Sequence, residues 1–134
     1  MATFSELVPK ANVTLLRRGV AVIGEREARL LEAVERVRSI KDAAAEAGIS
    51  YRTAWSAIQQ MESALGRPVV VSRAGGPGGG ATTLTSECRE LLGRFHELRQ
   101  RLEDDLTHAW GNGDEVESPS SNALAGDRER VTAG

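Results

Sequence analysis

Residues 39–66 read SIKDAAAEAGISYRTAWSAIQQMESALG, and this stretch predicts two helices joined by a tight turn. The first helix is expected from about Ile40 to Ala47, and the second from about Tyr51 to Leu65. Ser39, with Asp42 three residues later, resembles a capping box for the first helix. Gly48 suits the left-handed conformation that ends a helix, and Ser50 suits the cap of the next one. The stretch therefore predicts a helix-turn-helix in which the second helix is the recognition helix.

The second helix has two chemically distinct sides. An apolar stripe recurs every three or four residues and is expected to face the core. It consists of Ala54, Ile58, Met61 and Leu65. The remaining N-terminal and outward positions carry side chains that can hydrogen-bond to phosphates and base edges. They are Ser50, Tyr51, Arg52, Ser56 and Gln59. Two helices joined by a Gly-containing turn also occur in helical domains that bind no nucleic acid.

A strand, a glycine-rich segment and a second strand are expected directly after the recognition helix. Residues 68–72 and 81–84 are rich in β-branched side chains, and residues 74–80 read AGGPGGG. This order predicts the wing of a winged helix, where glycine backbone can approach a phosphate chain closely. A flexible hairpin tip is the alternative interpretation. A nucleotide phosphate loop is excluded, because that loop ends in Lys-Ser/Thr and opens a helix, whereas a strand follows here.

The chain before the helix-turn-helix predicts a hairpin and one helix. Residues 12–16 and 19–23 are short apolar or β-branched runs that pair as a hairpin or form an irregular arm. Gly24 precedes a helical pattern from about Glu25 to Val37, with charged residues on its outer side. The first eleven residues show no clear period and are expected to be flexible.

The longest predicted helix begins at Thr85 or Ser86 and continues to about Trp110. Its apolar residues recur at a three-to-four spacing over about seven turns. An apolar stripe of that length favours a second copy of the chain packing along it. The expected dimer-interface residues are Leu91, Phe95, Leu98, Leu102 and Leu106. Alternatively, the helix folds back onto the first predicted helix, and Trp110 closes the core. Both arrangements can hold, with one portion of the helix in the dimer interface and another in the core.

Composition and charge set broad limits. The 134 residues suit one domain with a tail, and a core built mainly from Leu, Val, Ile and Ala. Residues 1–110 carry 15 basic and 14 acidic side chains, and residues 111–134 carry two and five, so charges of +1 and −3 sum to −2. Residues 111–134 are also rich in Gly, Ser and Asn, which predicts a disordered acidic tail. The expected domain is 12–110, with its dimerisation helix at 85–110.

The residue inventory argues against an enzyme. Cys88 is the only cysteine, which excludes an intrachain disulfide and a Cys-based metal site. His96 and His108 are 12 residues apart on one predicted helix, too far to share a metal, and neither has an adjacent carboxylate arranged to orient it. No catalytic grouping, cofactor or metal is predicted. No transmembrane or signal segment is evident, so a cytoplasmic, nucleoid-associated bacterial protein is expected.

Two segments together resemble a known family. AGISYRTAWSAIQQME, residues 47–62, followed by AGGPGGGATTLT, residues 74–85, is similar to the N-terminal winged-helix domain of the ModE family of molybdate-responsive regulators. The resemblance covers about residues 12–110, and the general layout is also similar to the LysR-type DNA-binding domain. The fold class expected is therefore α+β, mainly α with small β. Its features are a winged helix-turn-helix, an N-terminal hairpin and a long C-terminal dimerisation helix.

The resemblance implies a homodimer that binds double-stranded DNA, with each recognition helix in a major groove and each wing on the backbone. The candidates for DNA contact are Lys41, Ser50, Tyr51, Arg52, Thr53, Ser56, Gln59, Arg73, Gly75, Gly76, Gly78, Gly79 and Gly80. The sequence departs from the family pattern at two positions. Glu62 stands where the family often has Asn, and Arg38 stands where Gly is expected before Ser39.

Three functions stay open from the sequence. The first is a sequence-specific transcriptional regulator that lacks the family's C-terminal molybdate-binding module, because the chain ends where that module would begin. Molybdate would then be sensed by a separate protein, by an unrecognised site, or not at all. The second is a protein-interaction adapter built on a winged helix. The third is an oxyanion sensor for molybdate or tungstate that uses the backbone amides of residues 75–80.

Overall fold

The computed structural model describes residues 6–75 and 80–111. The expectations for the first five residues, for the loop residues Gly76, Gly78 and Gly79, and for a disordered tail beyond Gly111 lie outside these ranges. One compact unit is Asn12–Arg99. The described residues before and after it belong to a second unit.

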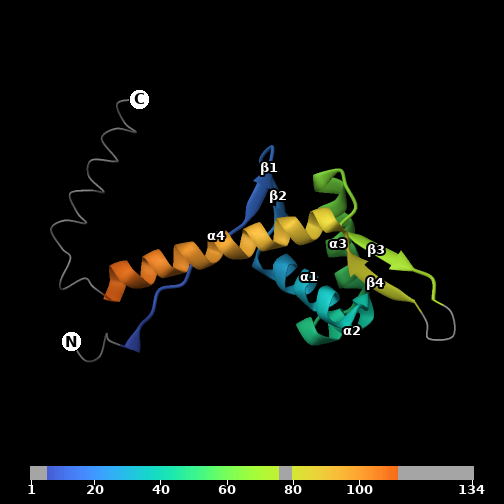
Figure 1. The fold of residues 1–134 in the computed structure, drawn as a ribbon, viewed down its shortest axis with the longest axis horizontal. Coiled ribbons are helices and arrows are strands. Elements are labelled where there is room, and N and C mark those ends of the chain that lie inside the picture. The colour runs from blue at the N-terminus through green and yellow to red at the C-terminus, as the bar shows by residue number, and fades with distance from the viewer. Residues whose placement is uncertain (1–5, 76–79, 112–134) are drawn as a thin grey trace. The chain divides into compact units, whose positions relative to one another are not determined.

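Four helices and two small hairpins make up the described fold (Figure 1). They are β1 (Leu15–Arg17), β2 (Val20–Ile23), α1 (Glu25–Val37), α2 (Ile40–Ala47), α3 (Tyr51–Leu65), β3 (Val70–Arg73), β4 (Ala81–Leu84) and α4 (Ser86–Gly111). β1 pairs antiparallel with β2, and β3 pairs antiparallel with β4. This is the expected α+β winged helix-turn-helix, and α1, α2, α3 and β4 have the predicted bounds.

The N-terminal segment forms the predicted hairpin rather than an irregular arm. Arg17 pairs with Val20, so Arg17 belongs to β1 and the connection shortens to Arg18 and Gly19. Both of these residues have positive φ, 53° and 80°. Two positive φ values define a primed two-residue turn, whose twist matches that of the flanking strands. The sequence analysis ended the first run at Leu16 and began the second at Gly19, because Arg17 carries no apolar side chain to mark the strand.

Side-chain and backbone caps begin and end the helices as the sequence predicted. Ser39 Oγ accepts a hydrogen bond from the backbone N–H of Asp42 at 3.0 Å, which caps the start of α2. Gly48 ends α2 with φ 73°, a left-handed conformation that glycine adopts without steric cost. Gly48 and Ser50, the N-cap of α3, make the turn between α2 and α3 short, and they set the direction in which α3 leaves it.

The turn between α1 and α2 carries an unusual backbone conformation. Arg38 has φ 59° and ψ 33°, and together with Arg18 it accounts for the positive-φ non-glycine residues of the described chain. For an L-residue with a Cβ this left-handed region costs about 1–2 kcal/mol. The carbonyl oxygen of Arg38 accepts a hydrogen bond from the backbone N–H of Thr82, in β4, at 3.0 Å.

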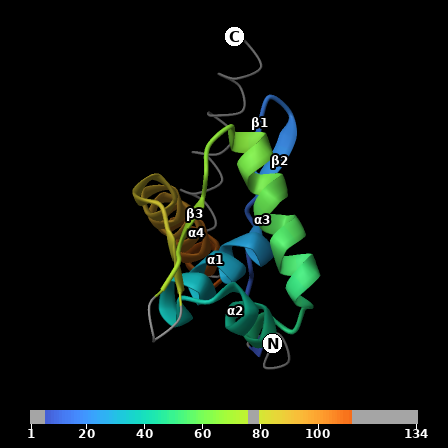
Figure 2. The same cartoon turned by 90° about the vertical axis from the view of Figure 1, so that its right-hand side faces the viewer.

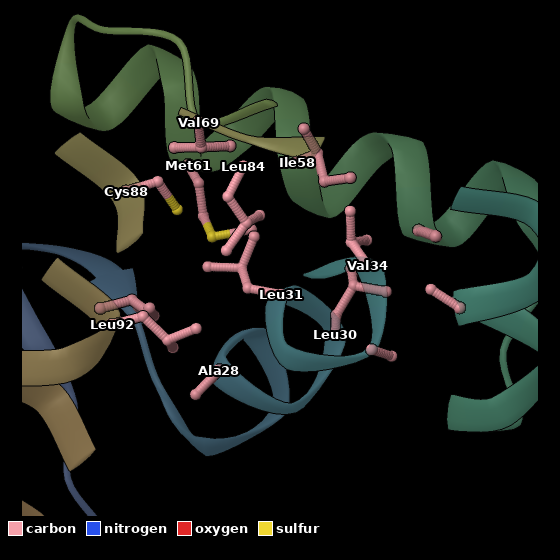
Figure 3. Close-up of a cluster of buried hydrophobic side chains, with 14 of the residues drawn as sticks. Ala28, Leu30, Leu31, Val34, Ile58, Met61, Val69, Leu84, Cys88 and Leu92 are labelled. Atoms are coloured by element: carbon pink, nitrogen blue, oxygen red, sulfur yellow. The ribbon is translucent and has the colours of Figure 1, made fainter. Parts of the chain in front are cut away.

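The core lies where α1, α3, the wing strands and the start of α4 meet. Figure 3 shows Leu31 of α1, Met61 of α3 and Leu84 of β4 pointing toward one another. These side chains are at most 2% exposed, and Ile58 of α3 is fully buried. The core therefore consists mainly of aliphatic side chains, with Met61, Cys88 and Phe95 beside them, as the sequence predicted.

The first part of α4 packs into this same core. Cys88, Leu92 and Phe95 are buried, with Phe95 1% exposed. Phe95 was expected in a dimer interface, and that expectation is wrong because the ring is enclosed by its own chain. The sequence pattern could not separate the two uses, since a core contact and a partner contact both call for an apolar side chain at the same spacing.

Ion pairs also join α4 to α1 within Asn12–Arg99. Arg89 Nε lies 2.8 Å from Glu35 Oε2, and Arg99 Nη1 lies 2.8 Å from Glu25 Oε1. Between them, His96 Nε2 contacts Glu32 Oε2. The expectation that His96 lacks an orienting carboxylate is therefore wrong. Glu32 is distant in sequence and comes beside His96 only when α4 packs against α1.

The second unit contains the end of α4. Trp110 is 51% exposed, and its indole Nε1 donates a hydrogen bond to the carbonyl oxygen of Leu7 at 2.8 Å. The alternative in which Trp110 closes the core is therefore wrong. An exposed ring with its N–H bonded to backbone anchors the residues before Asn12 rather than filling the interior.

Candidate nucleic-acid interface

α3 presents one buried side and one exposed polar side, as the sequence predicted. Ala54, Ile58 and Met61 are buried, and Leu65 is half-buried against the core. On the other side, four polar residues are exposed over three turns of the helix. They are Tyr51, Arg52, Ser56 and Gln59. Among the described residues, no hydrogen bond or ion pair is recorded for Arg52, Ser56 or Gln59, so these side chains have donors and acceptors available for a ligand.

The cap of α3 uses two of the candidate side chains. Thr53 donates its backbone N–H to Ser50 Oγ at 3.0 Å, and Ser50 donates its hydroxyl to Thr53 Oγ1 at 2.9 Å. The hydroxyl proton of Ser50 is thus engaged, while the hydroxyl of Thr53 keeps a donor. Ser50 therefore serves first to begin the recognition helix, and Thr53 retains the freer group for an external contact.

An aromatic pair stands at the exposed start of α3. The rings of Tyr51 and Trp55 meet edge to face, with centroids 6.3 Å apart and an interplanar angle of 89°. Trp55 packs partly against the core, whereas Tyr51 is 53% exposed. Trp55 belongs to the motif that carries the family resemblance, but it was not among the residues predicted to contact DNA. It supports the Tyr51 ring from one side, and the i, i+4 spacing was the signal that could have shown this.

The wing strands form a regular ladder in the described residues. Val70 pairs with Leu84 and Arg73 with Ala81, and the hydroxyls of Ser72 and Thr82 lie 3.1 Å apart across the ladder. Arg73 is exposed near the tip, as expected for a backbone contact. Gly75 is exposed as well.

Gly80 stands where only glycine fits. A Cβ built at this position would lie 2.4 Å from the carbonyl oxygen of Arg73. A carbon atom cannot approach a backbone oxygen so closely without displacing it. The glycine at this position therefore has a packing role at the base of the loop, in addition to any role against DNA.

Two contacts hold the C-terminal end of α3. Arg17 Nη1 donates to the carbonyl oxygens of Ala64 and Leu65, at 3.0 and 2.9 Å. These carbonyls have no partner within the helix, so the guanidinium satisfies them and ties the hairpin to α3. Glu62 Oε2 accepts a hydrogen bond from the backbone N–H of Val69 at 3.0 Å. Sequence reasoning missed both contacts, because the partners lie in other elements.

The wing and α2 meet at the turn that contains Arg38. Thr82 bonds to the carbonyl oxygen of Arg38, and Lys41 follows three residues later on the exposed side of α2. Figure 2 shows the wing strands running beside this turn, whereas the β1–β2 hairpin lies at the other end of α3. The start of α2, the start of α3 and the wing therefore surround one side of the unit, and Arg38 lies among them.

Other chemistry in the described residues is limited. A cavity of about 490 Å³ lies between α1, the end of α2 and the start of α3. Its three carboxylates are each engaged by a protein group. Glu27 accepts from the N–H of Gly24, Glu32 contacts His96, and Glu46 contacts Arg36. The part of the chain that the structure describes contains no group of three ligands suited to a metal ion.

Neither the Cys88 thiol nor the helices of the described residues suggest a further function. Burial, with a contribution from Glu35, raises the pKa of the Cys88 thiol from 9.0 to about 11. A thiol that stays protonated is a poor nucleophile and a poor metal ligand. Within residues 6–75 and 80–111, no helix combines the length and apolar character that crossing a membrane requires.

These features define a winged helix-turn-helix protein. Residues 26–89 match the family model described as the bacterial regulatory helix-turn-helix protein of the lysR family. The match begins in α1 and ends in the first turn of α4, so it includes α2, α3 and both wing strands. Residues 26–89 therefore form a LysR-type helix-turn-helix domain.

The similar proteins narrow this class further. The chain is 37% identical over 101 residues to the molybdenum-pterin-binding protein MopA of Rhodobacter capsulatus, covering 75% of this chain and 37% of MopA. It is 41% identical over 78 residues to the molybdenum transport protein ModE of Azotobacter vinelandii, covering 58% and 29%. It is 40% identical over 76 residues to the DNA-binding transcriptional dual regulator ModE of Escherichia coli K12, covering 56% and 29%.

The chain is thus a relative of the N-terminal DNA-binding domain of the ModE family. It spans about a third of the length of the curated relatives that it matches. The resemblance inferred from residues 47–62 and 74–85 is confirmed.

Proposed function

We propose that this protein is a sequence-specific DNA-binding transcriptional regulator of the ModE type. In this proposal α3 enters the major groove, and the glycine-rich wing lies on the sugar–phosphate backbone. The observation that carries the proposal is the division of α3 into a buried apolar side and an exposed side that bears Arg52, Ser56 and Gln59. Arginine, serine and glutamine side chains are suited to base edges and phosphates.

The contacts at the two ends of α3 also support its use as a recognition helix. Ser50 begins α3 at the exposed surface, so the first turn of the helix, with Tyr51 and Arg52, is the part that would enter a groove first. Arg17 and Glu62 hold the opposite end of the helix to the hairpin and to the segment before β3. A recognition helix anchored at its far end presents its first turn in a defined orientation. Such preorganisation lowers the entropic cost of binding.

We also propose a homodimer formed through α4. Leu98 is 42% exposed in the unit Asn12–Arg99, although Leu is normally buried when its surroundings permit. Leu102 and Leu106, in the second unit, are each 39% exposed. With Leu91, which is half-buried, these residues form the proposed dimer interface, called the seam below. Phe95 is not part of the seam, because it is buried in the core of its own chain. A two-fold dimer would double every DNA contact.

A response to molybdate is proposed to lie outside the DNA-binding residues. The names of the relatives refer to molybdenum transport and molybdenum-pterin binding, and the chain corresponds to about a third of each relative. We assign DNA binding to residues 12–99. Any response to the oxyanion would then depend on a separate effector-sensing protein or on residues outside those described.

Selection of bound DNA from the source genome tests the proposal. Purified protein is mixed with sheared genomic DNA at moderate salt, with and without molybdate, and the retained fragments are sequenced. Enrichment of a shared two-fold symmetric site would support a dimeric regulator. If no fragment is enriched, DNA recognition is wrong and a protein-interaction adapter replaces it. Enrichment that changes with molybdate would show that the chain itself senses the oxyanion.

A further inference from the structure

Arg38 has an exposed, charged side chain, although its backbone conformation is one that favours glycine. Its φ is 59°, in the left-handed region that glycine adopts freely and other L-residues rarely adopt. Backbone strain of this kind persists where the surrounding structure enforces it, and it is concentrated at functional sites. The question is therefore what the side chain contributes that glycine would not.

The structural contacts of Arg38 use its backbone alone. Its N–H donates to the carbonyl oxygen of Val34 at 2.7 Å and ends α1, and its carbonyl oxygen accepts from Thr82 of the wing at 3.0 Å. Glycine could make both contacts in the same conformation. Within the described residues, no hydrogen bond or ion pair is recorded for the guanidinium, and the residue is exposed. The side chain thus has no partner here that would explain its presence.

The position of Arg38 suggests the missing partner. The residue immediately precedes Ser39, the cap of α2, and Lys41 lies three residues further along. The carbonyl oxygen of Arg38 also accepts a hydrogen bond from Thr82, in strand β4 of the wing. The proposed complex places the wing on the DNA backbone, and Lys41 of α2 is a candidate for DNA contact. A guanidinium between them would meet a phosphate, for which arginine has a planar, doubly donating geometry.

We propose that Arg38 is a phosphate-contacting residue that helps to position the wing and α2 on DNA. The proposal rests on the proposed DNA-binding function and extends it to a residue where neither the sequence motifs nor the family pattern placed a contact. A phosphate contact fixes the register of the protein on the duplex and carries no base preference of its own. Its loss should therefore weaken binding to all sequences alike.

A glycine substitution separates the side chain from the backbone conformation. Arg38→Gly removes the guanidinium and relieves the left-handed strain. The chain also offers a matched control, because Arg18 is exposed and left-handed in the turn of the β1–β2 hairpin. That hairpin contacts the C-terminal end of α3, about 20 Å along the helix from its first residue. Arg18→Gly loses the same charge in the same conformation, away from the proposed DNA surface.

The test is a salt titration of DNA binding together with thermal melting. Fluorescence anisotropy measures the affinity of each variant for a fragment selected with wild-type protein and for a scrambled duplex. For Arg38→Gly we expect a melting temperature that is not lowered, and equal weakening on both duplexes. The slope of log K against log salt should decrease by about 0.9 per chain, and by twice that for a dimer. Arg18→Gly should keep the wild-type slope, and Arg38→Lys should recover most of the lost slope.

Three results would overturn the proposal. Unchanged affinity and slope in Arg38→Gly would show that no phosphate is contacted. Weakening confined to the selected fragment would indicate a base contact instead. A lower melting temperature with unchanged affinity would assign the side chain to the fold. If wild-type protein binds neither duplex, the proposed function fails together with this inference, and that outcome is distinct from the other three.

Discussion

Glu62 of α3 accepts a hydrogen bond from the backbone N–H of Val69, with 3.0 Å between Oε2 and the nitrogen. Val69 is 1% exposed and directly precedes β3, so its N–H has little access to water. A single carboxylate therefore links the last turn of the recognition helix to the strand that leads into the wing. The family pattern often has Asn at this position, and the longer Glu side chain makes the contact here.

Glu62→Ala should destabilise the fold by about 1–3 kcal/mol, because the N–H of Val69 loses its acceptor in a nearly dry environment. Urea denaturation followed by circular dichroism gives the free energy of unfolding. Glu62→Gln keeps a carbonyl oxygen at the same reach and should lose clearly less. Equal stability of Glu62→Ala and wild type would mean that water replaces the carboxylate.

Gly80→Ala should weaken DNA binding by distorting the base of the wing. The new Cβ would lie 2.4 Å from the carbonyl oxygen of Arg73, so β3 and β4 must move apart. Gly93→Ala provides the control, since a Cβ at that helical position meets nothing within 4 Å. Replacing a helical glycine with alanine usually stabilises by about 0.5–1 kcal/mol. Gel shifts and thermal melts of both variants test this. Unchanged affinity in Gly80→Ala would separate the wing from DNA binding.

Cys88 predicts a loss of stability at alkaline pH. Its thiol titrates near 11 in the folded chain, against an ordinary pKa of 9.0, because burial disfavours the thiolate. Below pH 9 both states are protonated and the full contribution is present. Between pH 9 and 11 the unfolded chain releases its proton first, so the free energy of unfolding falls by at most roughly 1.4 kcal/mol per pH unit.

Comparison with Cys88→Ala isolates this effect from the other groups that titrate in the same range. Urea midpoints are measured at several pH values from 8 to 11 for both proteins. The wild type should lose stability faster than Cys88→Ala above pH 9. Parallel curves would show that the thiol is not desolvated. As a second readout, iodoacetamide at pH 8 should modify Cys88 slowly in the native protein and rapidly in urea.

The sequence predicted the elements of this fold closely because the signals are local. Ser39, Gly48 and Ser50 are caps, and caps depend on residues within one turn of the helix. The apolar stripe of α3 follows the helical period, and the structure buries Ala54, Ile58 and Met61 while Leu65 is half-buried. These patterns need no knowledge of distant residues.

What the sequence could not predict depends on tertiary packing. Phe95 and Leu98 share an apolar stripe, yet the structure buries one at 1% and leaves the other 42% exposed. The His96–Glu32 contact likewise needs two helices that are distant in sequence to come together. In the sequence, Arg38 is distinguished only by standing where the family pattern has Gly. Its left-handed backbone and its bond to Thr82 become visible only in three dimensions.

Leu98→Glu should dissociate the proposed homodimer. Leu98 is 42% exposed in the single chain, so a charge there leaves the monomer folded but would be buried without a partner in the seam. Burying an unpaired charge costs several kcal/mol, which exceeds what a modest interface supplies. Sedimentation equilibrium gives the mass of each variant, and Leu98→Ala should shift the dissociation constant less. A wild-type dimer that survives Leu98→Glu would place the interface elsewhere.

Arg52 provides the most direct test of the recognition helix. It is the second residue of α3, and it is exposed on the side opposite Ala54 and Ile58. Its guanidinium can therefore bind guanine O6 and N7 or a phosphate oxygen, and these two contacts have different signatures. A base contact predicts that Arg52→Ala loses about 1–3 kcal/mol per half-site and relaxes the preference at one base pair. A phosphate contact predicts equal weakening on all sequences and a salt slope smaller by about one.

We expect the base contact, because the first turn of α3 is the part that enters the groove first. The experiment measures binding of wild type and Arg52→Ala to a panel of duplexes that carry every single substitution in a selected site. Arg52→Lys keeps the charge but not the forked geometry, so it should restore general affinity without restoring the base preference. The melting temperature should stay at the wild-type value, since the side chain lies outside the core. If folded Arg52→Ala protein binds as tightly and as selectively as wild type, α3 is not the recognition helix.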